Sequence, residues 1–135
     1  MPSEAQLRAA MQAYLDALNN RDVKGIIALF AAGGTVEDPV GSGVHDAGPG
    51  LTRLVGGLPE GATFTLDTPI RASHGSGAAM AFTVRMVVNG ISVHIRSLDV
   101  MQFDEAGLIT EMKAYYGPSD ITSPEGEVIP IHQLM

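Results

Sequence analysis

The sequence predicts an α+β domain in which a curved, mixed or antiparallel sheet wraps over helices near the N-terminus. Residues 3–30 carry the spacing of two amphipathic helices, and residues 64–116 carry four runs of alternating apolar residues. The chain has 135 residues, of which 45% are hydrophobic, so it is long and apolar enough for one buried core. Helices followed by a meander of strands are typical of the α+β class.

The first helix is predicted from Ser3, because Ser3 and Gln6 form a capping-box pattern. Tyr14 lies on the apolar stripe that follows, and we expect it to face the core. The members of this stripe are Leu7, Met11, Tyr14, Leu15 and Leu18.

A second, shorter helix is predicted after Asp22, with Ile26, Leu29 and Phe30 facing inward and Gly33-Gly34 ending it. An extended edge segment from Thr35 to Val40 is expected next. Its inward side chains are Val36, Asp38 and Val40, while Glu37 points away. Pro39 restricts Asp38 to extended geometry and marks a strand end.

Residues 41–61 are rich in Gly and Pro, and one weak helix is expected at Leu51 to Leu58. The strand-like runs come after it, and Asn89-Gly90 predicts a type I′ hairpin between the second and third. The inward positions of the first run are Phe64, Leu66, Thr68 and Ile70. Those of the second run are Met80, Phe82, Val84, Met86 and Val88. Those of the last run are Leu108, Thr110, Met112, Ala114 and Tyr116.

Asp99 is the most informative residue, because it shares the inner face of the third strand, Ile91 to Phe103, with apolar side chains. A buried carboxyl without a partner raises its pKa and becomes neutral. Asp99, Asp38 and Tyr14 are therefore expected to face one apolar cavity. Each residue also has a structural alternative when taken singly: Asp99 as a satisfied buried acid, Asp38 as a turn residue, and Tyr14 as a core phenol.

The formal net charge of −7, with only eight scattered Lys and Arg residues, argues against nucleic-acid binding. The chain has no cysteine, which excludes thiolate chemistry, and its histidines show no metal-ligand spacing. The first residues do not form a signal peptide and no stretch has membrane-spanning length, so we expect a cytoplasmic protein with no membrane partner.

Three segments resemble the bacterial Δ5-3-ketosteroid isomerases, members of the NTF2-like and SnoaL-like superfamily. Tyr14 on the first helix resembles the tyrosine of their oxyanion hole. The other two segments are Thr35-Val36-Glu37-Asp38-Pro39-Val40-Gly41, which resembles their general-base segment, and Leu98-Asp99-Val100-Met101-Gln102-Phe103-Asp104-Glu105, which resembles their oxyanion-hole strand.

The resemblance implies a cone-shaped fold and a cofactor-free steroid Δ-isomerase. Asp38 would carry a proton from C4 to C6 of a 3-oxo-Δ5 steroid, while Tyr14 and protonated Asp99 donate hydrogen bonds to the C3 oxygen. These roles come from the family, which is the established example of such paired acids. The expected apolar lining for the steroid is Leu18, Phe82, Val84, Met86, Met112 and Tyr116.

The resemblance also implies a homodimer, and outward Leu98 and Val100 are compatible with a covered sheet face. It covers roughly Leu7 to Gly117, and we expect residues 1–117 to form one domain and residues 118–135 to form a tail outside the match. Alternative functions are a polyketide cyclase or epoxide hydrolase of the same fold, or a non-catalytic small-molecule binding module. A hydrolase is expected to need two acids bridged by an inward arginine or a held water, and Arg71, Arg85 and Arg96 are all predicted to face outward.

Overall fold

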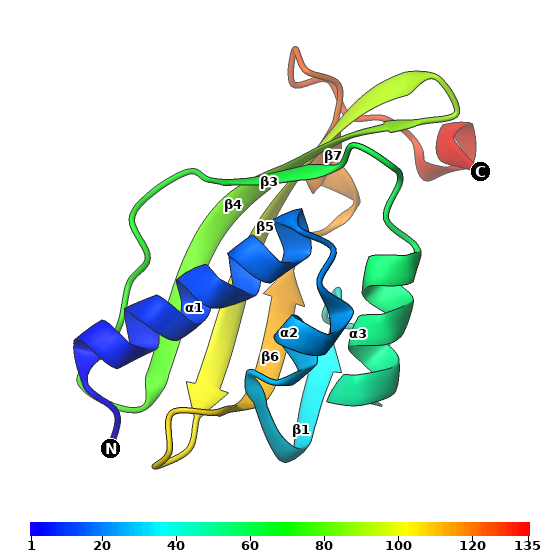
Figure 1. The fold of residues 1–135 in the computed structure, drawn as a ribbon. Coiled ribbons are helices and arrows are strands. Elements are labelled where there is room, and N and C mark those ends of the chain that lie inside the picture. The colour runs from blue at the N-terminus through cyan, green and yellow to red at the C-terminus, as the bar shows by residue number, and fades with distance from the viewer.

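The computed structural model describes all 135 residues. Three α-helices pack on one curved, seven-stranded sheet (Figure 1). The strand order is β2-β1-β6-β5-β4-β3, and β7 pairs with β5 beside this path. The helices are α1 (Glu4–Asn19), α2 (Val23–Ile27) and α3 (Ala47–Gly56). The strands are β1 (Phe30–Glu37), β2 (His45–Asp46), β3 (Thr63–Leu66), β4 (Gly77–Val88), β5 (Ile91–Phe103), β6 (Ile109–Tyr115) and β7 (Ile121–Thr122).

The predicted α+β class is confirmed, and the sheet is mixed because β1 runs parallel to β6 while the other pairs are antiparallel. Strand β5 is its centre. It pairs with β4 along its whole length, with β6 from Leu98 to Phe103, and with β7 at His94 and Ile95. The tail thus continues the sheet beside β5 beyond the end of β6.

The start of α1 agrees with its prediction, since Ser3 and Gln6 form the reciprocal capping box. At the other end, Asn19 exchanges two hydrogen bonds with the backbone of Phe64 at 2.8 and 2.9 Å. This exchange anchors the helix to edge strand β3. Both ends of α1 are therefore held by hydrogen bonds, and Tyr14 lies on the buried face of the helix between them.

Helix α2 is shorter than predicted, because the chain leaves the helix at Ile27 and enters β1 at Phe30. Long-range pairing overrides the local helical spacing here: the Ile109 N–H donates to the Leu29 carbonyl at 2.9 Å, and Phe30 pairs with Ile109. The expected helix stop, Gly33-Gly34, lies inside β1, where the register with β6 shifts and Gly33 has φ +76°. Nor is β1 the edge strand, because the short β2 lies outside it.

Two further boundaries differ from prediction. Helix α3 begins at Ala47 and ends at Gly56, earlier than the predicted segment. In β6, Ile109 is buried and Leu108 is exposed, the reverse of the expected phase. A bulge explains the reversal, because Gln102 pairs with Glu111 while the next residue, Phe103, pairs with Ile109, which leaves Thr110 unpaired.

The buried side chains form two clusters on the inner face of the sheet. The larger lies between the sheet and the helices and contains Tyr14. The smaller consists of Val93, Ile121 and Ile129, where the tail covers the far end of the β4–β5 hairpin (Figure 1). Met86 and Ile95 pack against both clusters, so the two are continuous.

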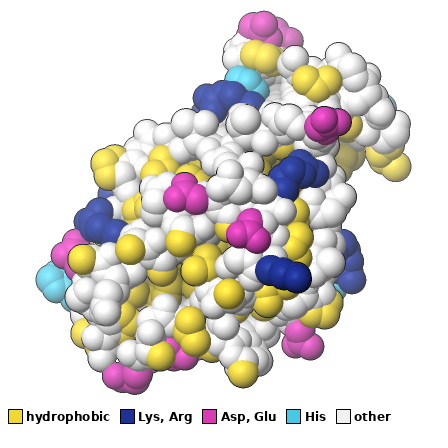
Figure 2. All heavy atoms as spheres, in the orientation of Figure 1, with side chains coloured by type: hydrophobic (Ala, Val, Ile, Leu, Met, Phe, Trp, Pro, Cys, Tyr) yellow, Lys and Arg dark blue, Asp and Glu magenta, His cyan; other side chains and the backbone are white.

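The surface in Figure 2 shows Lys and Arg side chains apart from one another rather than gathered into a basic patch. None of the helices has the length and apolar character needed to cross a membrane.

Candidate active site

Four residues form a row across the inner face of the sheet and bring the two predicted acids to one place. Asp99 on β5 lies between Met80 on β4 and Ala114 on β6. Asp38 directly follows Glu37, the last residue of β1, which pairs with Lys113. Two strand spacings, about 10 Å, therefore separate the backbones of Asp38 and Asp99. The residue between them is alanine, whose small side chain leaves the space above it to the two carboxyls.

Tyr14 approaches this row from α1 and is completely buried, with 0% of its surface exposed. Its ring packs at a tilt on Phe30, with ring centroids 6.3 Å apart. No protein group forms a hydrogen bond with its hydroxyl. Every other buried side-chain oxygen or nitrogen in the chain has a hydrogen-bond partner. A buried phenol normally finds a partner, so this hydroxyl has a free donor in the interior.

Asp99 is 1% exposed and has no cationic neighbour. Burial raises its pKa well above the ordinary value, and the charge of Asp38 raises it further. One contact acts in the opposite direction: the Ser97 hydroxyl donates to Asp99 Oδ1 at 3.2 Å. The environment therefore favours the neutral acid.

Asp38 has a different environment, because it is only partly buried and lines a cavity of about 260 Å³. We call this space the Asp38 cavity. Burial raises the pKa of Asp38 to about 6. Asp38 therefore ionises below neutral pH, whereas burial and the charge of Asp38 oppose the ionisation of Asp99.

Tyr116, just beyond β6, belongs to the same electrostatic neighbourhood. Burial, followed by the charges of Asp38 and Asp99, raises its pKa to about 12. Tyr14 shows the same pattern, with a pKa raised by burial, then by Asp99, then by Asp38. The charge of Asp38 thus raises the pKa values of Tyr14, Asp99 and Tyr116, so the structure brings Tyr14, Asp38 and Asp99 into one electrostatic neighbourhood.

The predicted lining residues fall into two groups. Leu18, Phe82, Val84 and Met112 are buried in the larger cluster, and Met112 also lines the Asp38 cavity. Met86 and Tyr116 are only partly buried and pack against the tail cluster. The six residues therefore extend from the row of acids toward the tail, and their role in lining a steroid site stays a prediction.

Sequence reasoning missed three residues near the acids. Ser97 had a visible signal, since it lies two positions before Asp99 on the same face of β5. Arg53 and His45 line the Asp38 cavity, although both are exposed and neither shifts the pKa of Asp38. Their approach depends on the packing of α3 and β2 beside β1, which local spacing does not reveal.

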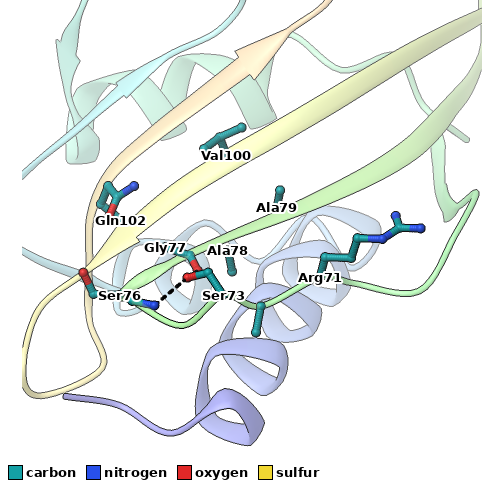
Figure 3. Close-up of a pocket in the computed structure, with 10 residues that line it drawn as sticks. Arg71, Ser73, Ser76, Gly77, Ala78, Ala79, Val100 and Gln102 are labelled. Carbon is teal, nitrogen blue, oxygen red and sulfur yellow. Dashed lines mark hydrogen bonds between the residues drawn. The ribbon is translucent and has the colours of Figure 1, made fainter.

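The cavity of largest volume, about 460 Å³, lies elsewhere (Figure 3). Its wall includes Arg71 and Ser73 from the loop before β4, and Val100 and Gln102 from the outer face of β5. Figure 3 shows no carboxyl group among its side chains. No cluster of three His, Asp or Glu residues anywhere in the chain is arranged to hold a metal ion.

Comparison with known proteins identifies the family of the chain. The model of the SnoaL-like domain family matches residues 11–112. The chain belongs to the SnoaL-like family. It is also 33% identical over 117 residues to the Steroid Delta-isomerase of Nocardioides simplex, an alignment that covers 87% of this chain and 94% of that protein. The resemblance inferred from the sequence motifs is thus confirmed.

A solved structure of SalBIII, an epoxide hydrolase/cyclase-like enzyme of pyran ring formation in polyether salinomycin, has the same fold. It superposes with a TM-score of 0.77 at 24% identity, covering 88% of this chain and 96% of the other. The family match includes Tyr14, Asp38 and Asp99, whereas the tail that builds β7 lies beyond it.

Proposed function

We propose that this protein is a steroid Δ-isomerase that converts 3-oxo-Δ5 steroids into conjugated 3-oxo-Δ4 steroids by moving one proton from C4 to C6. The observation that carries the proposal is the contrast within one site: a partly buried, ionisable Asp38 faces a sealed Asp99 and a sealed Tyr14 hydroxyl without a partner. Paired groups with pKa values pushed apart are the pattern of acid–base catalysis.

Asp38 acts as the general base. In the first step its carboxylate takes a C4 proton, and the electrons of the C4–H bond form a dienolate with negative charge on the C3 oxygen. In the second step the carboxylic acid returns the proton to C6, and the double bond comes to rest between C4 and C5. No atom is gained or lost, and a base with a pKa of about 6 is ionised at neutral pH yet able to return the proton.

Tyr14 and neutral Asp99 stabilise the charge that develops on the C3 oxygen. Both donors are buried in the core, and donors held in place before the reaction need no solvent reorganisation when charge appears. An oxyanion also supplies the acceptor that the Tyr14 hydroxyl lacks. The steroid enters from the side of Asp38, since Asp38 lines a surface cavity whereas Tyr14 and Asp99 are fully buried.

The Nocardioides simplex relative supports the reaction class, because its name states a steroid Δ-isomerase and the alignment covers nearly all of both chains. The homodimer implied by the sequence resemblance is part of the proposal. Leu98, 44% exposed on the outer sheet face, and the neighbouring Val100 are compatible with a dimer contact. Light scattering on the purified protein measures its mass.

The direct test is to mix the purified protein with 5-androstene-3,17-dione and follow the ultraviolet absorbance of the conjugated enone. We expect the absorbance to rise far faster than in buffer. An unchanged buffer rate with folded protein, shown by circular dichroism, overturns the proposal. Deuterium at C4 that reappears at C6 distinguishes direct transfer by one base from exchange with water.

Epoxide opening is the second candidate, and it rests on Arg53, which lines the Asp38 cavity in a fold shared with SalBIII. The three arginines expected to face outward, Arg71, Arg85 and Arg96, are all exposed. Burial alone raises the pKa of Asp38, and Arg53 does not lower it. This disfavours a mechanism in which an arginine holds the acid. Diol or cyclic ether formation from an epoxide substrate, without steroid isomerisation, favours this candidate. Tight phenol binding without any turnover favours a binding module.

A further inference from the structure

The tail forms a second apolar cavity, of about 320 Å³, beside the acids. We call it the tail pocket. Its wall is almost entirely hydrophobic and includes Pro39, Tyr116, Ile121, Val128, Ile129 and Ile131. The tail residues of this wall come from the segment beyond the SnoaL-like match, and the catalytic proposal assigns them no role.

The tail pocket meets the site at two residues. Pro39 is the chain neighbour of Asp38, and Tyr116 lies close enough for its pKa to respond to both Asp38 and Asp99. Tyr116 is also packed against the tail cluster. The inner end of the pocket therefore adjoins the row of acids.

The inner face of β5 joins the two places. From Asp99 the inward side chains run through Ser97 and Ile95 to Val93, which belongs to the tail cluster. Ile95, which pairs with β7, lies four positions before Asp99, a distance of about 14 Å at about 3.4 Å per residue. A long, rigid molecule that is held by its oxygen at Asp99 and lies along this face reaches the tail.

We propose that the tail pocket is a distal subsite that binds an apolar substituent at C17 of the steroid, so the preferred substrates carry an alkyl group there rather than a polar one. This inference rests on the proposed function for the orientation of the steroid. The pocket wall has no charged side chain to hold a polar C17 group. Buried alkyl carbons gain affinity by leaving water.

The test compares the binding of two saturated ketones that cannot isomerise and differ only at C17. The ligands are 5α-androstan-3-one, with hydrogen at C17, and 5α-pregnan-3-one, with an ethyl group. Burial of two carbons predicts that the wild type binds the pregnane roughly tenfold more tightly. Titration calorimetry measures both Kd values.

Val128→Glu places a charge at the rim of the tail pocket and is expected to abolish that difference. Val128 is 55% exposed, so the substitution leaves the core intact. Val87→Glu is the matched control, because Val87 is also 55% exposed but lies on β4 away from the pocket. It is expected to retain the preference.

Equal Kd values in the wild type, a preference that survives Val128→Glu, or no binding of either ketone overturns the subsite. The isomerisation of 5-androstene-3,17-dione is measured on the same samples. Turnover without the C17 preference refutes the subsite alone. The preference without turnover refutes the isomerase while the subsite stands.

Discussion

Asp38 and Asp99 are the same amino acid, two strands apart on one face of one sheet, yet their surroundings differ. Asp38 stands just past the end of β1 at the wall of a cavity, with a pKa of about 6. Asp99 stands in the middle of the longest strand, sealed from solvent, with its pKa raised by burial and by Asp38. Position in the sheet, rather than residue type, separates the proposed base from the proposed neutral acid.

The strongest way to break this comparison is Asp38→Asn, which keeps the shape and removes the base. We expect kcat to fall by about 100- to 10,000-fold, because proton transfer loses its acceptor. Glu37→Gln is the control. Glu37 is the adjacent acid, and its carboxylate accepts a hydrogen bond from the Gly41 N–H at 3.0 Å, which glutamine can also accept. Near-wild-type activity in Asp38→Asn refutes the assignment of the base.

Asp99 is tested by comparing two substitutions. Asp99→Ala removes the donor and is expected to lower kcat by about 100- to 1,000-fold. Asp99→Asn keeps a neutral N–H donor and is expected to retain much more activity. Steady-state kinetics on both variants decide the matter, since equal losses indicate that the carboxylate, not the neutral acid, is required.

Tyr14→Phe separates activity from stability. The loss of a donor is expected to lower kcat by about 100- to 1,000-fold. The free energy of unfolding, measured by urea denaturation, is expected to rise by about 1–3 kcal/mol, because a buried hydroxyl without a partner is removed. Tyr115→Phe, at an exposed phenol, is expected to change neither quantity. A Tyr14→Phe protein that is destabilised contradicts this interpretation.

The pH dependence follows from the raised pKa of Asp38. Below pH of about 6 we expect kcat/KM to fall about tenfold per unit, because protonated Asp38 accepts no proton. Stability behaves oppositely. In the unfolded chain the group ionises near its ordinary pKa of 3.8, so between that pH and about 6 the native state binds more protons. Stability contributed by this group therefore falls as pH rises through this window. Denaturation of Asp38→Asn, which lacks this slope, is the check.

Ser97→Ala gives the smallest expected effect. The hydrogen bond from Ser97 lowers the pKa of Asp99, so its loss raises that pKa and moves the alkaline limb of the kcat profile to higher pH. The rate at neutral pH is expected to change roughly 2- to 10-fold through looser positioning. Ser97→Thr retains a hydroxyl and is expected to restore the wild-type limb. An unmoved limb in Ser97→Ala contradicts a role for this contact.

The fold was predictable where local pattern and tertiary structure agree. The strand Ile91 to Phe103 and the Asn89-Gly90 turn have the predicted bounds, and both turn residues have positive φ, 51° and 78°. The end of α2 and the start of β1 were not predictable from local spacing. Phe30 joins the sheet because it pairs in parallel with a strand about 80 residues away. The bulge at Thr110 is likewise a property of the pairing and leaves no local signal.

The candidate site was predictable to the extent that it follows strand phase and family motifs. Inward phasing placed Asp99 and Tyr14 in the core, where both are buried. The tail pocket was not foreseen, because its walls meet only after β7 pairs with β5. The approach of Arg53 to the Asp38 cavity depends on helix packing in the same way.

The unpaired Tyr14 hydroxyl has a practical consequence for identifying ligands. A molecule that offers an oxygen acceptor there completes the hydrogen bonding of the interior and binds only the folded chain, so it raises the melting temperature with its concentration. The loss of that response in Tyr14→Phe marks compounds that reach the buried phenol. A thermal shift screen of the two proteins side by side thus reports the site occupied without any assay of turnover.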